Sequence, residues 1–111
     1  MHKGYKTQID QIFHETSIYK SLIICQDSST YLQLFYQLYD DNYPVSDVLS
    51  VNKFSSNENR ILMLDLVDLS NLNNLLTEDD EKKINAVFIV GCEEIPVTSF
   101  NMDVVNLYVI N

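Results

Sequence analysis

Short apolar runs and longer segments of periodic hydrophobicity alternate along this chain. Continuous apolar runs lie at residues 22–25, 61–64 and 86–90, and weaker ones lie at 45–51 and 104–110. Continuous runs of this length are typical of strands that are buried on both faces of a parallel sheet. The pattern therefore predicts five strands.

Two helices are predicted in the first half of the chain. Residues 4–16 place four side chains on one helical face, namely Tyr5, Ile9, Ile12 and Phe13. Residues 27–30 are N-cap types, and they precede a second helix that runs through residue 39. Its predicted apolar stripe comprises Tyr31, Leu34, Phe35 and Leu38, widened by Leu32 and Tyr39. Leucines at 69–76 and a capping pattern at 77–80 indicate further helical pieces.

Strands that alternate with helices favour right-handed crossovers and a mainly parallel sheet. With 111 residues, we expect one α/β domain: an N-terminal helix over residues 1–17 and an α/β core over 21–111. The spacing suits a flavodoxin-like sheet of order 2-1-3-4-5, with the late helices missing or shortened. The working edge of such a sheet is formed by the carboxyl ends of its strands. It would hold Gln26, Asp27, Asp65, Asp68, Gly91 and Asn111.

Sixteen acidic residues against seven basic ones give a formal net charge of −9. Lys and Arg supply much of the affinity for nucleic acids and for anionic membranes, so neither is an expected partner. The charge suits a basic partner, or solubility alone. No apolar run approaches the roughly 20 residues that a membrane span needs. Residues 1–10 lack a signal-peptide core, so we expect a cytoplasmic protein.

Residues that usually carry catalysis are few. The two histidines, His2 and His14, have no Cys or His at metal-ligand spacing and support no catalytic triad. There is no glycine-rich phosphate loop. Cys25 and Cys92 end apolar runs and are expected to be free, buried thiols. In the predicted order they lie two strands apart, about 10 Å, which is too far for a disulfide. The sequence therefore predicts no enzyme.

Four segments resemble the receiver domain of response regulators: "LIICQDSSTYLQLFYQLYDDNYPV", "RILMLDLVDLSNL", "NAVFIVGCEE" and "VVNLYVIN". Receivers end their first strand in two acids and their third in the phosphorylated Asp. Their fourth strand ends in Ser or Thr and their fifth in Lys. By this resemblance the acid positions hold Gln26 and Asp27, and the phosphate-accepting position holds Asp65. The hydroxyl and lysine positions hold Gly91 and Asn111.

The resemblance thus implies a degenerate acidic pocket. Phosphoryl transfer to a carboxylate needs Mg²⁺, which prefers hard oxygen ligands. Asp27 and Asp65 would hold Mg²⁺ only weakly, so we expect no cofactor. Similar degenerate receivers form the N-terminal domains of LuxR-type biofilm regulators, where they dimerise.

We therefore expect a non-catalytic pseudo-receiver that serves signalling or transcriptional control through a protein partner, with a homodimer as one form. Two alternatives stay open. One is an acidic inhibitor or immunity-type protein that covers a basic partner. The other is an active receiver that is phosphorylated on Asp65.

The N-terminal helix has no counterpart in a receiver, which instead continues into a C-terminal fifth helix. We hypothesise that Tyr5, Ile9, Ile12 and Phe13 pack where that last helix would, either in cis or against a second copy. Among the other aromatic residues, Tyr36 and Tyr43 join Tyr5 as candidates for exposed contacts. Tyr31, Phe35, Tyr39 and Phe88 are interpreted as core.

Overall fold

The computed structural model describes residues 4–16, 20–48, 60–65, 82–92 and 106–111. Along the chain these residues form α1 (Tyr5–Glu15), β1 (Lys20–Cys25), α2 (Ser28–Asp40), β2 (Val45–Asp47), β3 (Arg60–Asp65), β4 (Ala86–Val90) and β5 (Asn106–Ile110). The helical pieces predicted over 69–80 and the shortened late helices lie outside the described residues.

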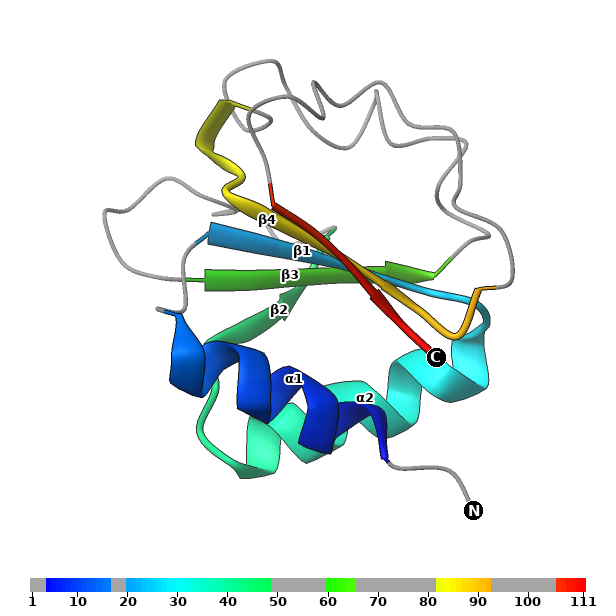
Figure 1. Cartoon of the computed structure of the whole chain (residues 1–111). Coiled ribbons are helices and arrows are strands. Elements are labelled where there is room, and N and C mark those ends of the chain that lie inside the picture. Colours follow the sequence, from blue (N-terminus) through cyan, green and yellow to red (C-terminus); the bar gives the residue numbers. More distant parts are fainter. Residues whose placement is uncertain (1–3, 17–19, 49–59, 66–81, 93–105) are drawn as a thin grey trace.

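The five strands run parallel in one sheet, in the order β2-β3-β1-β4-β5 (Figure 1). This confirms the predicted α/β fold, with its five-stranded parallel sheet and its additional N-terminal helix. The predicted order 2-1-3-4-5 was right at both edges and wrong in the centre, where β1 lies between β3 and β4. Each of the three central strands contains a continuous, fully buried apolar run, so hydrophobicity alone does not fix their order.

Side chains alternate between the two faces of the sheet, as the strand period of two requires. Both described helices cover one face (Figure 1). There, strand residues Ile23, Met63 and Phe88 pack with helix residues of α1 and α2, namely Ile9, Phe13, Leu34 and Leu38. The opposite face is equally buried and includes Leu22, Ile24, Leu62, Leu64, Val87 and Ile89.

Helix α1 packs against the sheet of its own chain, which is one of the two arrangements that the sequence analysis allowed. Ile9 is fully buried, and the Phe13 ring lies 5.3 Å from Phe88 and 5.5 Å from Tyr43 between ring centroids. Polar contacts fix the same helix: Lys6 Nζ donates to Asp41 at 2.9 Å, and the Tyr43 hydroxyl donates to Asp10. Partial burial, together with that hydrogen bond, raises the pKa of Tyr43 to about 12.

Helix α2 ends at Asp40, as predicted, and Asn42 then takes a left-handed conformation with a φ of 64°. Asn adopts this conformation more readily than most residues other than glycine. Leu34 and Leu38 are buried, which confirms the centre of the predicted stripe. The prediction that Leu32 and Tyr39 extend this buried stripe was wrong. Leu32 is 51% exposed and Tyr39 is 63% exposed, because both lie on the outer side of the helix.

Both cysteines are free and buried, as predicted. The expected separation of the two cysteines by two strands was wrong. Strands β1 and β4 are neighbours, and Cys25 pairs with Val90. Cys25 and Cys92 belong to the two different hydrophobic clusters, on opposite faces of the sheet. The sheet itself therefore separates the thiols.

Candidate functional site at the carboxyl edge of the sheet

Asp27 and Asp65 lie at the same edge of the sheet. Asp65 ends β3 and stands in register with Cys25, the last residue of β1, and Asp27 follows two residues later. The Ser28 hydroxyl, in the first turn of α2, donates to Asp65 Oδ2 at 2.9 Å. Adjacent parallel strands thus bring together two carboxylates that are 38 residues apart in the sequence.

Asp27 serves as the N-cap of α2. Its Oδ1 accepts a hydrogen bond from the backbone N–H of Thr30 at 2.7 Å, in the way that capping residues satisfy the first turn of a helix. The hydrogen bonds from the Thr30 backbone and hydroxyl lower the pKa of this carboxyl, since they stabilise its charged form. Asp27 is therefore already engaged in a structural contact.

A second contact at this edge joins Gly91, Gln26 and Tyr5. Gly91 directly follows β4 and has a φ of 74°. A Cβ at this position would lie 3.0 Å from Gln26 Cδ and 3.1 Å from the Tyr5 hydroxyl oxygen. Gln26 also donates through Nε2 to the Thr30 hydroxyl at 3.3 Å. The aromatic residue at the start of α1 thus closes against the end of β4.

Asn111 follows β5 and is exposed. Its backbone carbonyl accepts a hydrogen bond from Gln8 Nε2 at 3.3 Å, which connects the end of β5 to α1. Asn111 lies at the predicted edge of the sheet, on the outermost strand.

The strand order divides the predicted site around β1. Asp65, on β3, lies to one side of the Gln26–Asp27 pair, and Gly91, on β4, lies to the other. In the order 2-1-3-4-5, the third strand would instead lie directly between the first and the fourth. Asp65 and Gly91, which the resemblance expected on neighbouring strands, are therefore separated by β1.

The residues at this edge do not fit a Mg²⁺ site. Mg²⁺ requires near-octahedral oxygen ligands and is usually held by one or two carboxylates together with a phosphate. Asp27 caps a helix, Asp65 accepts the Ser28 hydroxyl, and Gln26 supplies an amide where a second acid would be needed. Within the described residues, no three His, Cys, Asp or Glu side chains gather as a metal site would require.

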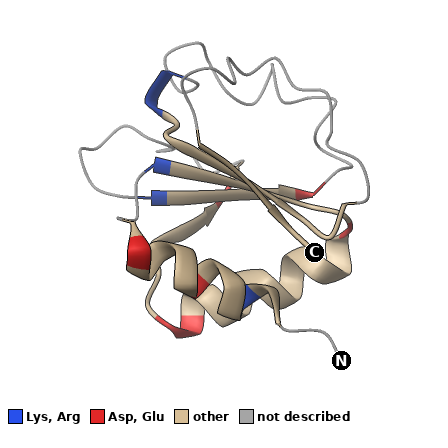
Figure 2. Ribbon diagram, viewed as in Figure 1, with Lys and Arg blue, Asp and Glu red and all other residues tan. Residues whose placement is uncertain are grey.

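Charges are separated along the strand direction (Figure 2). Lys20 and Arg60 begin β1 and β3 in register, so they lie together at the amino edge. Asp27 and Asp65 lie at the carboxyl edge, as does Asp47, which ends β2 and accepts a hydrogen bond from the Tyr31 hydroxyl. Partial burial and this hydrogen bond raise the pKa of Tyr31 above its usual value. Parallel strands place all their carboxyl ends at one edge, which makes that edge acidic.

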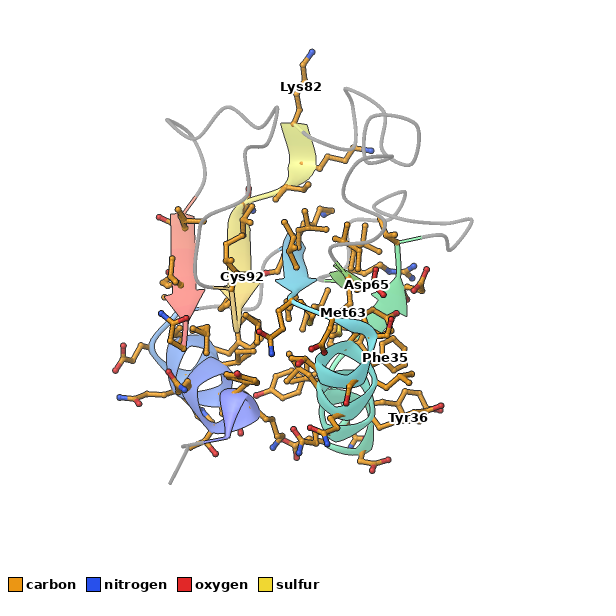
Figure 3. All side chains as sticks on the ribbon, turned by 90° about the vertical axis from the view of Figure 1, so that its right-hand side faces the viewer. Phe35, Tyr36, Met63, Asp65, Lys82 and Cys92 are labelled. Atoms are coloured by element: carbon orange, nitrogen blue, oxygen red, sulfur yellow. The ribbon has the colours of Figure 1, made fainter. Side chains whose placement is uncertain are left out.

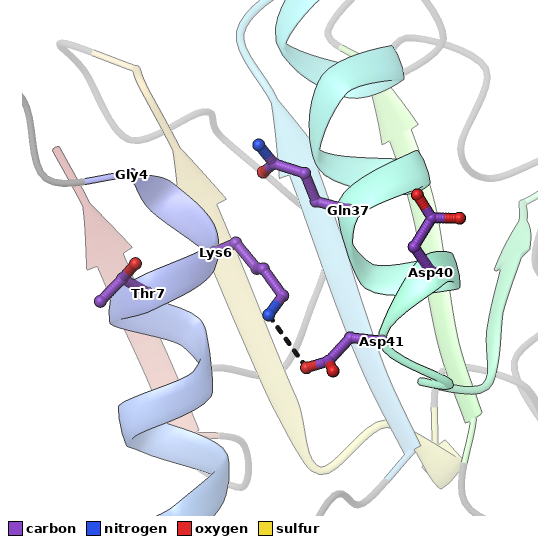
Figure 4. Close-up of a pocket in the computed structure, with 6 residues that line it drawn as sticks. All are labelled: Gly4, Lys6, Thr7, Gln37, Asp40 and Asp41. Atoms are coloured by element: carbon purple, nitrogen blue, oxygen red, sulfur yellow. Dashed lines mark hydrogen bonds and ion pairs between the residues drawn. The ribbon is translucent and has the colours of Figure 1, made fainter.

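A shallow groove between α1 and α2 is a second concave feature of the described surface. It is lined by Gly4, Lys6, Thr7, Gln37, Asp40 and Asp41. Figure 4 shows that Lys6 reaches across from α1 to Asp41 at the end of α2. Because Lys6 also pairs with Asp10 at 3.0 Å, its charge is already balanced within the chain. An internal ion pair therefore bridges the groove, and Lys6 is not available there to bind an anion.

The sequence interpretation missed the exposed apolar face of α2. Tyr36 was expected as an exposed contact and is 60% exposed, whereas Leu32 and Tyr39 were assigned to the core. Figure 3 shows Tyr36 extending outward from α2, while Phe35 lies nearer to the sheet. The signal was present in the i, i+4, i+7 spacing of Leu32, Tyr36 and Tyr39, which is a helical stripe of its own.

Comparisons with known proteins give no relative. No family model matches the chain, and no curated protein or solved structure matches it either. Among the described helices, none has the length and apolar character needed to cross a bilayer.

Proposed function

We propose that the chain is a regulatory protein-binding domain of the pseudo-receiver type, with no catalytic activity of its own. The carboxyl edge carries this proposal. Asp27 and Asp65 gather there in the manner of a receiver pocket, but by the resemblance Gln26, Gly91 and Asn111 stand at the positions of the first acid, the hydroxyl and the lysine. A carboxylate pair without a counter-charge has little means of stabilising a transferred phosphoryl group.

The polar contacts at this edge favour a structural role over chemistry. Asp27 caps α2, and Ser28 links the start of that helix to Asp65. These contacts fix α2 on the sheet, so the same residues that would form a catalytic pocket instead position a helix. A domain of this kind would act in cytoplasmic regulation by presenting a surface to a protein partner.

Treatment with acetyl phosphate and Mg²⁺, followed by intact-mass measurement, tests the proposal. We expect no mass increase of a phosphoryl group, in the wild type or in the Asp65→Ala variant. A phosphoryl adduct that forms on the wild type and is lost in Asp65→Ala would instead establish an active receiver.

A second candidate is an acidic inhibitor or immunity-type protein, which the net charge of −9 favours. The two functions differ in their partner. A regulatory domain would bind a like domain or a regulator, whereas an inhibitor would bind a cationic protein with an affinity that falls steeply as salt is added. Binding to the isolated partner at low and high ionic strength distinguishes them.

A further inference from the structure

The outer face of α2 carries an apolar stripe. Leu32, Tyr36 and Tyr39 are 51%, 60% and 63% exposed. In the described part of the chain, one further large hydrophobic residue is comparably exposed, Val109 on β5. Isolated exposed hydrophobic residues are ordinary, but three at i, i+4 and i+7 form one continuous helical face. We call these three residues the α2 stripe.

The α2 stripe is supported from below by aromatic packing. Tyr36 meets Phe35 edge-on, with 6.0 Å between ring centroids, and Phe35 in turn stacks on Tyr31 at 5.8 Å. The buried residues Leu34 and Leu38 fix the opposite side of the helix on the sheet. A rigid helix that presents aromatic side chains loses little conformational entropy on binding, and Tyr is enriched among residues that dominate protein interfaces.

The charges around the stripe are acidic. Helix α2 contains no Lys, Arg or His; Asp27 caps its start and exposed Asp40 ends it. The adjacent strand ends add Asp47 and Asp65 at the carboxyl edge. The nearby cation Lys6 is paired with both Asp10 and Asp41, so it does not reverse the sign of this region.

From this combination we infer that the α2 stripe docks a cationic protein surface, in which an apolar patch is flanked by Lys or Arg side chains. This inference rests on the protein-binding part of the proposed function, which the regulatory domain and the acidic inhibitor share. It names the surface that binds and the chemistry of the partner. Helix-in-groove recognition uses anchors at this spacing, and complementary charge steers association and excludes wrong partners. A second copy would bring acidic surroundings against acidic surroundings, so charge disfavours it as the occupant.

The test uses the full-length, ¹⁵N-labelled chain and a synthetic amphipathic helix of Leu and Lys as the probe. We expect amide shifts to concentrate on α2, and the affinity measured by calorimetry to fall as NaCl is raised from about 0.05 M to about 0.5 M. A peptide of the same composition in scrambled order controls for charge alone, and a Leu–Glu helix of the same pattern controls for apolar contact alone. Neither control should shift α2.

A triple variant, Leu32→Gln with Tyr36→Gln and Tyr39→Gln, removes the stripe while keeping residues that favour a helix. Its affinity for the Leu–Lys helix should fall by about tenfold or more, because a few central residues supply most of the affinity of an interface. Val109→Thr is the matched control, since it removes an exposed apolar group from β5 and should leave the affinity unchanged.

Three results would overturn the inference: unchanged affinity of the triple variant, amide shifts that avoid α2, or equal binding of the Leu–Glu helix. Concentration-dependent self-association in sedimentation, abolished by the triple variant, would make a second copy the occupant instead. The acetyl phosphate experiment is independent of all these results. Failure of the docking surface is thus distinguishable from failure of the proposed non-catalytic role.

Discussion

At the scale of single residues, the carboxyl edge is organised by backbone requirements. Gly91 takes a φ of 74°, and its missing side chain leaves room for Gln26 and the Tyr5 hydroxyl. Asp27 satisfies an N–H group in the first turn of α2. By the resemblance drawn from the sequence, both residues were expected to form part of a receiver pocket. Their roles here are set by local conformation and hydrogen bonding.

Replacement of Gly91 by Ala should destabilise the fold by about 1–2 kcal/mol, because an L side chain is strained in the left-handed region. Urea unfolding followed by circular dichroism measures the change. Gly91→Asn is the matched control, since Asn places a Cβ at the same point but tolerates this backbone better, and it should lose less. Equal losses in both variants would mean that crowding against Gln26 and Tyr5, and not strain, limits this position.

The capping role of Asp27 predicts a dependence of stability on acidic pH. Its pKa is lower in the folded state than in the unfolded chain, so its contribution is fully present above the unfolded value of about 4. That contribution is lost as the pH falls through the lower, folded value. Asn also caps helices but does not titrate.

Melting curves measured from pH 7 down to pH 2 test this expectation. Between pH 4 and pH 2, Asp27→Asn should lose less stability than the wild type. Asp27→Ala should melt lower than the wild type at pH 7, by a margin that shrinks toward pH 2. Parallel curves for the wild type and Asp27→Asn across this range would contradict a capping carboxylate.

At the scale of elements, α1 is an integral part of the core. Ile9 and Phe13 are buried against the sheet, and Lys6 and Asp10 connect the helix to the turn after α2. This arrangement agrees with the hypothesis that the N-terminal helix takes the place of a last helix in cis. Tyr5 and Ile12 keep partial exposure, and a role of this helix in contacts with a second copy stays a prediction.

Truncation of Phe13 to Ala should cost about 3–5 kcal/mol, as for other buried aromatic residues. That is a large share of the roughly 5–15 kcal/mol that stabilises a typical domain. Gln11→Ala, on the exposed side of the same helix, should change stability by less than about 0.5 kcal/mol.

Deletion of residues 1–17 should lower both the melting temperature and the solubility. An unchanged melting curve on deletion would show that α1 does not belong to the core.

At the scale of the whole molecule, the sheet separates both charges and thiols. Parallel strands place Lys20 and Arg60 at one edge and Asp27, Asp47 and Asp65 at the other (Figure 2). The same sheet holds Cys25 and Cys92 in clusters on opposite faces. Burial raises the pKa of Cys25 to about 12 and also raises the pKa of Cys92, which keeps both thiols protonated near neutral pH.

Thiol reactivity should therefore report global unfolding. With Ellman's reagent at pH 8, we expect neither cysteine of the native chain to react rapidly, and both to react after denaturation in urea. The denatured chain calibrates the count at two thiols. Rapid reaction of one thiol in the native state would indicate local opening around that residue or a lowered pKa.

Local patterns in the sequence were sufficient for the elements themselves. Continuous apolar runs marked β1, β3 and β4, and the N-cap residues marked the start of α2, because strand burial and capping depend on neighbouring residues. The same patterns predicted that Asp27 and Asp65 lie at one edge, because each stands at the carboxyl end of a strand in a parallel sheet. They also indicated that Leu34 and Leu38 face the core.

Tertiary structure alone decided how the central strands are ordered and which side chains of α2 remain exposed. Residues 22–25, 61–64 and 86–90 are equally apolar, so each pairing buries similar area and no local signal selects among them. The observed pairing puts β1 between Asp65 and Gly91 and so divides the expected pocket. Likewise, Leu32 and Tyr39 lie outside because packing on the sheet uses only one side of α2, a boundary that the helical period does not specify.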